Sequence, residues 1–235
     1  MMWLIDALIF MMGASIASFF NLFLERRERG EGWIAKRSHC DACGTEIGGL
    51  YLVPVFGYFL ARGTCRCGAR IPRRHPLTEC FGGLVWVLQI HIMTIKGAFS
   101  YAYIVWITFL LYLALEDILF REVYTQELVV AFALSLLATF RYGEWHILSG
   151  LFMVALLAMI YFLFKRGFGE GDIYYGSLIA LSVPGVWQTY LYFTASVCLA
   201  ASMGAIYHVK YGLKDGKVPM YPFFLLGWSV VRYFF

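Results

Sequence analysis

Charged residues are scarce in this sequence. They make up 14% of the 235 residues, and 61% of the residues are hydrophobic, whereas soluble domains are about half apolar and about one quarter charged. The mean hydropathy is +0.69. Because the few charges are clustered, they leave apolar windows of about membrane-spanning length. This pattern excludes an ordinary soluble domain and predicts an all-α membrane protein that crosses the bilayer several times.

A basic N-terminal segment is also missing, although a secretory signal peptide would begin with one. Basic residues follow the first apolar run instead, as Arg26, Arg27 and Arg29. This order favours a retained first transmembrane helix, residues 1–24, with its N-terminus outside the cell.

The apolar runs predict about eight transmembrane helices. Their expected ranges are Trp3–Leu24, Leu77–Ile95, Ala98–Leu115, Leu128–Phe140, Ile147–Phe164, Ile173–Val183, Val186–Val209 and Pro219–Phe234. The polar segment 25–76, between the first two runs, is large enough for a small extramembrane domain. Residues 77–235 then form the main membrane domain.

The distribution of basic residues predicts the orientation in the membrane. With the N-terminus outside, the inner segments hold sixteen lysines and arginines and the outer segments hold three. The inner set comprises the ten basic residues of segment 25–76 with Arg121, Lys165, Arg166, Lys210, Lys214 and Lys217; the outer set is Lys96, Arg141 and Arg232. We therefore expect a cytoplasmic insert. This topology accounts for the net charge of +4 without a nucleic-acid partner, and it favours contact with anionic lipid.

Four of the six cysteines lie in the insert, as Cys40-x-x-Cys43 and Cys65-x-Cys67. Four thiolates suit tetrahedral zinc, and a segment this small benefits from a metal that holds it together. Disulfides are disfavoured in the cytosol. The alternatives are redox-active cysteines and thiols without a ligand.

Two acidic residues interrupt or end apolar runs. Asp172 closes the segment Gly167-Phe168-Gly169-Glu170-Gly171-Asp172, and Asp117 ends an earlier run. Glycine destabilises helices, so we expect one helix to end here and another to begin near Asp172. Ionisable residues at a membrane margin indicate a functional site. The predicted topology places both aspartates on the cytoplasmic side, which suggests that they form a pair.

Several motifs together resemble the bacterial type IV prepilin peptidases, which are bifunctional leader peptidases and N-methyltransferases. The matching segments are Gly13 with Ser18-Phe19-Phe20-Asn21, the two cysteine pairs, Arg74-His75-Pro76-Leu77-Thr78-Glu79, Gly169-Glu170-Gly171-Asp172, and Pro219-Met220-Tyr221-Pro222-Phe223. The last segment resembles a Pro-Phe-Gly-Pro-Phe motif, and the Gly-x-Gly-Asp segment is typical of intramembrane aspartyl proteases. The sequence departs from the family in the shorter second cysteine pair and in Tyr174, where a lysine is usual.

The resemblance implies an aspartyl endopeptidase of the bacterial inner membrane that removes basic leaders from prepilins or pseudopilins. Asp117 and Asp172 would be catalytic, since one carboxylate and one carboxylic acid can share a proton. Gly169, Glu170 and Gly171 would bind substrate, because backbone that is free of helical bonding can pair with an extended peptide.

The resemblance also implies N-methylation of the new N-terminus with S-adenosylmethionine, although the sequence has no glycine-rich nucleotide motif. The insert and Glu79 are the expected participants, and Glu79 is equally consistent with a structural acid paired to Arg73 or Arg74. Two other functions remain open: an ion- or proton-coupled transporter that uses Asp117 and Asp172, and an inactive scaffold for pilus assembly.

Overall fold

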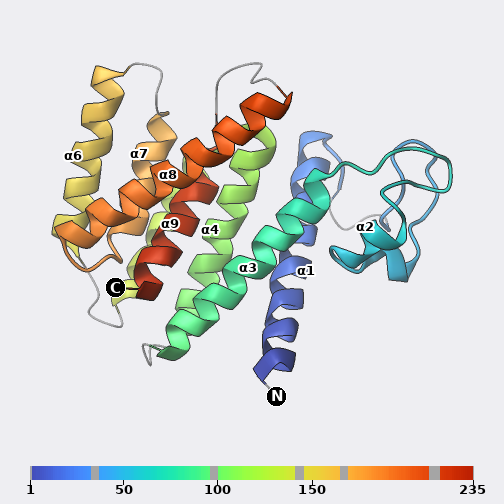
Figure 1. Ribbon diagram of the computed structural model, residues 1–235, viewed down its shortest axis with the longest axis horizontal. Helices are drawn as coiled ribbons and strands as arrows, with labels where there is room; N and C mark the ends of the chain where they lie inside the picture. Colours follow the sequence, from blue (N-terminus) through green and yellow to red (C-terminus); the bar gives the residue numbers. More distant parts are fainter. Residues whose placement is uncertain are drawn as a thin grey trace. The chain divides into compact units, whose positions relative to one another are not determined.

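The computed structural model describes residues 2–32, 37–95, 100–140, 146–164, 169–211 and 218–234 (Figure 1). Its elements are α1 (Met2–Glu28), the 3₁₀ turn η1 (Gly49–Leu52), α2 (Phe56–Leu60), α3 (Arg74–Ile95), α4 (Tyr101–Phe120), α5 (Thr125–Phe140), α6 (Ile147–Leu163), α7 (Glu170–Ala180), α8 (Val186–Tyr211) and α9 (Tyr221–Phe234). Within these ranges the only extended pairings are two isolated β-bridges. The predicted all-α class is therefore confirmed.

The eight longer helices of the described chain match the eight predicted apolar runs within a few residues. Four of them, α1, α3, α4 and α8, are long and apolar enough to cross a membrane, and α5 and α6 are shorter apolar helices. The insert with its four cysteines lies between α1 and α3, as expected. Seven basic residues used to predict the orientation, Lys36, Lys96, Arg141, Lys165, Arg166, Lys214 and Lys217, lie outside the described residues.

The chain divides into two compact units, Met1–Ile90 and His91–Phe235. The first unit contains α1, the cysteine insert and most of α3. Small residues let α1 and α3 approach closely, as is common for membrane helices. A Cβ atom on Gly13 would lie 2.6 Å from the carbonyl oxygen of Gly82, and one on Gly83 would lie 2.6 Å from the ring of Phe10.

The second unit contains helices α4 to α9. The last helix, α9 (red in Figure 1), packs against α4, α7 and α8. A buried aromatic cluster joins α4 to α9: the rings of Trp106 and Trp228 meet edge to face at 5.4 Å, and Tyr103 packs beside both. Both α9 and α5 contact α4 and α7, so these two helices connect the helices carrying Asp117 and Asp172.

The contact between α8 and α9 leaves no room for a side chain at Gly227. A Cβ atom there would collide with the hydroxyl oxygen of Ser196 and would lie 2.8 Å from the backbone nitrogen of the same residue. We predict that Gly227→Ala lowers the free energy of unfolding by about 1–3 kcal/mol, the usual cost of overpacking. Thermal unfolding of the detergent-solubilised protein measures this effect. The control is Gly49→Ala, because a Cβ atom at Gly49 meets nothing within 4 Å; equal unfolding temperatures for the two variants would contradict the prediction.

Candidate functional site

The four cysteines of the insert lie on two similar tight turns. In the first turn, the N–H of Cys40 donates to the carbonyl of Thr45 at 2.9 Å, and the N–H of Gly44 donates to the carbonyl of Cys40 at 2.8 Å. In the second turn, Cys65 donates to Ala69 at 2.8 Å and Gly68 donates to Cys65 at 2.9 Å. Gly44 and Gly68 both have positive φ, +68° and +86°, a conformation that favours glycine. The shorter second cysteine pair is thus accommodated by a turn that is one residue shorter.

These turns bring the four sulfur atoms within 4.8 Å of one another. The Sγ atoms of Cys40 and Cys67 are 3.9 Å apart, as are those of Cys43 and Cys65. Disulfide bonds need about 2.05 Å, so these pairs are free thiols. The structure therefore confirms that Cys40, Cys43, Cys65 and Cys67 form a cluster that can hold a metal ion.

Polar neighbours stabilise the first turn of the cluster. The Sγ atom of Cys43 donates to the hydroxyl oxygen of Thr45 at 3.3 Å. Hydrogen bonding with the side chain and backbone of Thr45 lowers the pKa of the Cys43 thiol to about 6, which favours the thiolate form that binds metals. Arg29, just after the end of α1, makes two hydrogen bonds of 2.8 and 3.0 Å to the carboxylate of Asp41. This guanidinium lowers the pKa of Asp41 below its ordinary value. The ion pair connects the first cysteine turn to α1.

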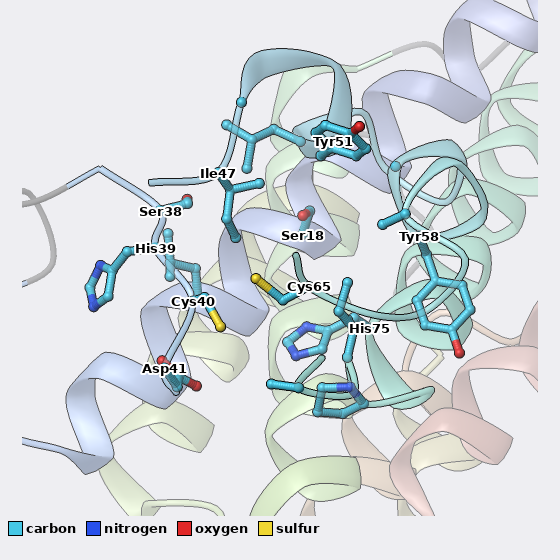
Figure 2. Close-up of a pocket in the computed structure, with 18 of the residues that line it drawn as sticks. Ser18, Ser38, His39, Cys40, Asp41, Ile47, Tyr51, Tyr58, Cys65 and His75 are labelled. Atoms are coloured by element: carbon cyan, nitrogen blue, oxygen red, sulfur yellow. The ribbon is translucent and has the colours of Figure 1, made fainter. Parts of the chain in front are cut away.

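A cavity of about 930 Å³ lies beside the cysteine cluster within the first unit. Figure 2 shows the side chains of Cys40 and Cys65 at its wall, with His75 and Tyr51 nearby. Its lining comes from α1, the insert and the first turns of α3. The volume lies in the range of small-molecule binding sites, about 300–1,000 Å³.

Glu79 belongs to the wall of this cavity and is buried, with 8% of its surface exposed. Its Oε2 accepts a 2.6 Å hydrogen bond from the backbone N–H of Val55. Val55 has φ +65° and ψ −56°, and the N–H of Phe56 donates to the carbonyl of Pro54 at 2.7 Å. These features define a γ-turn of the rare, strained form. Glu79 therefore stabilises a strained segment beside the cavity. The sequence did not indicate that Val55 would be its hydrogen-bond partner; an ion pair with Arg73 or Arg74 was the expected alternative.

Arg74 is instead paired with Glu25. Its guanidinium lies 2.7 Å from the Glu25 carboxylate, and the His75 ring lies 3.5 Å from the same group. This cluster connects the end of α1 to the start of α3 within the first unit.

Asp117 lies in the last turn of α4 and is buried, with 8% of its surface exposed. Its Oδ2 accepts a 2.9 Å hydrogen bond from the backbone N–H of Tyr221, the first residue of α9. The two residues are 104 positions apart in sequence. A helix N-terminus presents unsatisfied N–H groups and partial positive charge, so α9 holds the carboxylate of Asp117 in a fixed place.

Asp172 lies in the first turn of α7, where the glycine-rich segment predicted a new helix. Its Oδ2 accepts a 2.8 Å hydrogen bond from the backbone N–H of Gly169, so it caps its own helix. Gly171, directly before Asp172, lies beside the hydroxyl of Tyr221, since a Cβ atom on Gly171 would be 2.6 Å from that oxygen. The structure thus places the two predicted aspartates around one residue of α9.

The three predicted substrate-binding residues precede Asp172. Gly169 and Glu170 are exposed, and Gly171 is half-buried. The carboxylate of Glu170 accepts a hydrogen bond from the hydroxyl of Tyr161 at 3.2 Å. Gly167 and Phe168, at the start of the same segment, lie outside the described residues.

Tyr221 is a residue whose position the sequence did not predict. Its segment was identified only as a motif, yet its backbone contacts Asp117 and its ring stacks on Tyr175 of α7. The one sequence feature that could have drawn attention to Tyr221 is that it replaces the glycine of the Pro-Phe-Gly-Pro-Phe motif.

Comparison with known proteins agrees with the family resemblance seen in the sequence motifs. Residues 11–93 match the model of the family described as Bacterial Peptidase A24 N-terminal domain. The chain is similar to proteins named prepilin leader peptidase/N-methyltransferase. The one from Myxococcus xanthus is 30% identical over 33% of this chain, and the match spans only 24% of that protein. The one from Dichelobacter nodosus is 26% identical over 83% of this chain and 71% of the relative. The Bacillus subtilis protein is 28% identical over 85% and 82%, respectively. No solved structure matches the chain significantly.

Proposed function

We propose that this chain, which belongs to the bacterial type IV prepilin peptidase family, is a membrane aspartyl endopeptidase that removes the basic leader from prepilins or pseudopilins. The observation that carries the proposal is the arrangement of Asp117 and Asp172 around the first residue of α9. The names of the relatives support this function, and none of them supports a transporter or an inactive scaffold.

Peptide hydrolysis by this pair needs one carboxylate and one carboxylic acid. The carboxylate deprotonates a water molecule, and the acid polarises the carbonyl of the scissile bond. Two adjacent carboxyl groups share one proton because both do not ionise easily together. Each aspartate has one oxygen held by a backbone N–H, from Tyr221 or from Gly169. These hydrogen bonds orient the other oxygens for the water and the substrate carbonyl.

The segment from Gly169 to Gly171 offers backbone groups to which a substrate in extended conformation can bind. Gly169 is in extended conformation, with φ −83° and ψ 162°, directly before α7. Backbone groups that are not used by a helix can pair with an extended peptide. A substrate strand bound here would have its peptide bond next to Asp172.

We predict that Asp117→Asn and Asp172→Asn each lower the rate of leader removal by about 10²–10⁴-fold, because the pair loses a proton donor or acceptor. The assay follows a co-expressed prepilin by mass spectrometry. The control is Glu122→Gln, which changes an exposed acid in the loop after α4. Cleavage at the wild-type rate in either aspartate variant would contradict the assignment.

The chain is a multi-pass protein of the bacterial inner membrane, with the N-terminus outside and the insert and aspartate pair on the cytoplasmic side. The excess of lysine and arginine in the inner segments supports this orientation. Cleavage at the cytoplasmic face follows from it, as does contact of the basic insert with anionic lipid headgroups.

The metal in the cysteine cluster is structural zinc. Tetrahedral coordination with Zn–S bonds of about 2.3 Å gives sulfur–sulfur distances of about 3.8 Å, and the sulfur atoms of the Cys40–Cys67 and Cys43–Cys65 pairs are 3.9 Å apart. Four sulfur ligands leave no open position for substrate, as in structural rather than catalytic zinc sites. Cys40, Cys43, Cys65 and Cys67 would hold the ion, and the ion would join the two turns of the insert.

We predict about one zinc ion per purified chain, measured by atomic emission. Cys40→Ala and Cys65→Ala should each lose most of this zinc, because each removes a ligand from a different turn. The matched controls are Cys80→Ala and Cys198→Ala, which change cysteines of α3 and α8. Full zinc content in the two ligand variants, or a disulfide-linked cluster without zinc, would show that the metal assignment is wrong.

The same protein N-methylates the new N-terminus, and the cavity of the first unit is the proposed site for S-adenosylmethionine. The volume of about 930 Å³ accommodates a ligand of this size. The cofactor has an adenine ring, a carboxylate and two positive charges; Tyr51, Arg62 and Glu79 of the lining offer a ring, a cation and an anion for them. When bound, it supplies an electrophilic methyl group. Glu79 additionally holds the strained turn at Val55 in place.

We predict that Glu79→Ala lowers N-methylation at least tenfold and weakens binding of S-adenosylmethionine, while leader removal continues. Mass spectrometry of the processed pilin N-terminus reports methylation and cleavage together, and calorimetry reports binding. Glu28→Gln, an exposed acid of α1 that does not line the cavity, is the control. Methylation at the wild-type level in Glu79→Ala would contradict the proposal that this cavity is the methylation site.

A further inference from the structure

Residues 47–61 of the insert, here called the apolar loop, contain no charged residue. The loop includes η1 and α2. It is too short to cross a bilayer, which takes about 20 residues of helix, and an apolar run of this length is typical of a buried helix or of a segment at the membrane interface. Five of its large apolar side chains expose between 45% and 74% of their surface, namely Leu50, Leu52, Phe56, Phe59 and Leu60. The apolar loop is therefore not part of a protein core.

The two helical turns of the apolar loop form one compact piece. A Cβ atom on Gly57 of α2 would collide with the carbonyl oxygen of Tyr51 in η1, so the two turns are in direct contact. The backbone of the loop also satisfies its own hydrogen bonds: the N–H of Gly57 donates to Val53 at 2.7 Å, and the N–H of Ala61 donates to Gly57 at 2.9 Å. A backbone that is bonded internally can enter an apolar medium, where unpaired polar groups would be costly.

The apolar loop lies beside the apolar part of α1 rather than beyond the charged end of that helix. The N–H of Val55 donates to Glu79 of α3 at 2.6 Å. The neighbouring residue Thr78 accepts a 2.6 Å hydrogen bond from the side-chain amide of Asn21 in α1. Asn21 precedes Glu25, the first charged residue at this end of α1, by about one helical turn. Val55 is therefore level with the last apolar turn of α1.

The cavity of the first unit gives a second indication of depth. Its wall includes Ser15 and Ser18 of α1 together with Tyr51 of the apolar loop, and Figure 2 shows Ser18 and Tyr51 on this wall. Ser15 precedes Glu25 by ten residues, which is about 15 Å along a helix. The loop thus folds back along α1, and this brings its exposed apolar side chains to the depth of a lipid leaflet.

Arginine residues border the apolar loop on the side where it continues to α3. Four of them are exposed, namely Arg62, Arg66, Arg70 and Arg73. An apolar surface flanked by basic side chains is typical of segments that lie in the membrane interface, with the apolar groups among the acyl chains and the cations at the headgroups. The chain on both sides of the insert is itself long and apolar enough to cross a membrane, as α1 and α3. These features favour lipid as the partner of the exposed surface.

We propose that the apolar loop inserts its exposed side chains into the lipid leaflet at this end of α1. Large exposed apolar patches mark sites of protein or membrane contact, and the depth of this patch along α1 selects the membrane. The insert is then partly embedded in the interface rather than suspended in water. Because the loop also forms one wall of the cavity, its insertion holds that cavity at the surface of the bilayer.

The test measures how fast a charged, membrane-impermeant maleimide labels single introduced cysteines in the full-length protein. The protein is held in lipid nanodiscs with one chain per disc, and each rate is divided by the rate for the same variant unfolded in detergent. Phe59→Cys and Glu46→Cys form a matched pair, because Phe59 is 67% exposed and the side chain of Glu46 is 65% exposed. Phe59→Cys should react at least tenfold more slowly than Glu46→Cys. Peptide mass spectrometry separates the introduced cysteine from the native ones.

Leu50→Cys tests the other helical turn of the apolar loop, and it should be protected to a similar extent because Leu50 is 74% exposed in the protein alone. Labelling of either loop variant at the rate of Glu46→Cys would overturn the proposal. Protection that appears only in discs with two chains would also overturn it, since the surface would then bind a second copy of the chain. Slow labelling of all three variants would do the same, because protein rather than lipid would then shield the whole insert.

Discussion

The hydrogen bond between the backbone N–H of Tyr221 and the carboxylate of Asp117 is the contact on which the aspartate site depends. It connects the start of α9 to the end of α4 across 104 residues of sequence. Side-chain packing continues the same connection, through the Trp106 and Trp228 rings on one side and the Tyr175 and Tyr221 rings on the other. A buried carboxylate needs hydrogen-bond partners, and α9 supplies one from its backbone. The position of Asp117 is therefore set by helix packing rather than by its own helix alone.

The two units of the chain use different means to position chemical groups. In the unit formed by residues 91–235, long apolar helices hold two acidic side chains by contacts between distant segments. In the unit formed by residues 1–90, local turns hold four thiols, and an ion pair between Arg29 and Asp41 attaches the first turn to α1. Glu79 adds a buried carboxylate that holds a strained turn beside a cavity. This difference is consistent with the two proposed activities, cleavage and methylation.

The sequence predicted the helices well because apolar runs and glycine-rich breaks act locally. The start of α7 at Glu170 follows from the glycines before Asp172, and the cysteine cluster follows from the spacing of its ligands. The contacts of Tyr221 were not predictable, since hydropathy shows that a segment is buried but not which helices surround it. Val55 gave no signal either, because valine rarely adopts positive φ; its conformation depends on the distant carboxylate of Glu79. The residue ranges of the helices could thus be predicted from the sequence, whereas the contacts between residues of different helices could not.

The most direct test of the central claim is a cryo-EM structure of the full-length Asp117→Asn variant with an uncleaved prepilin bound. The proposed mechanism predicts that the scissile peptide bond lies within hydrogen-bond reach of both residue 117 and Asp172. A leader junction bound away from these residues, or carboxyl positions too far apart to contact one peptide bond, would contradict it.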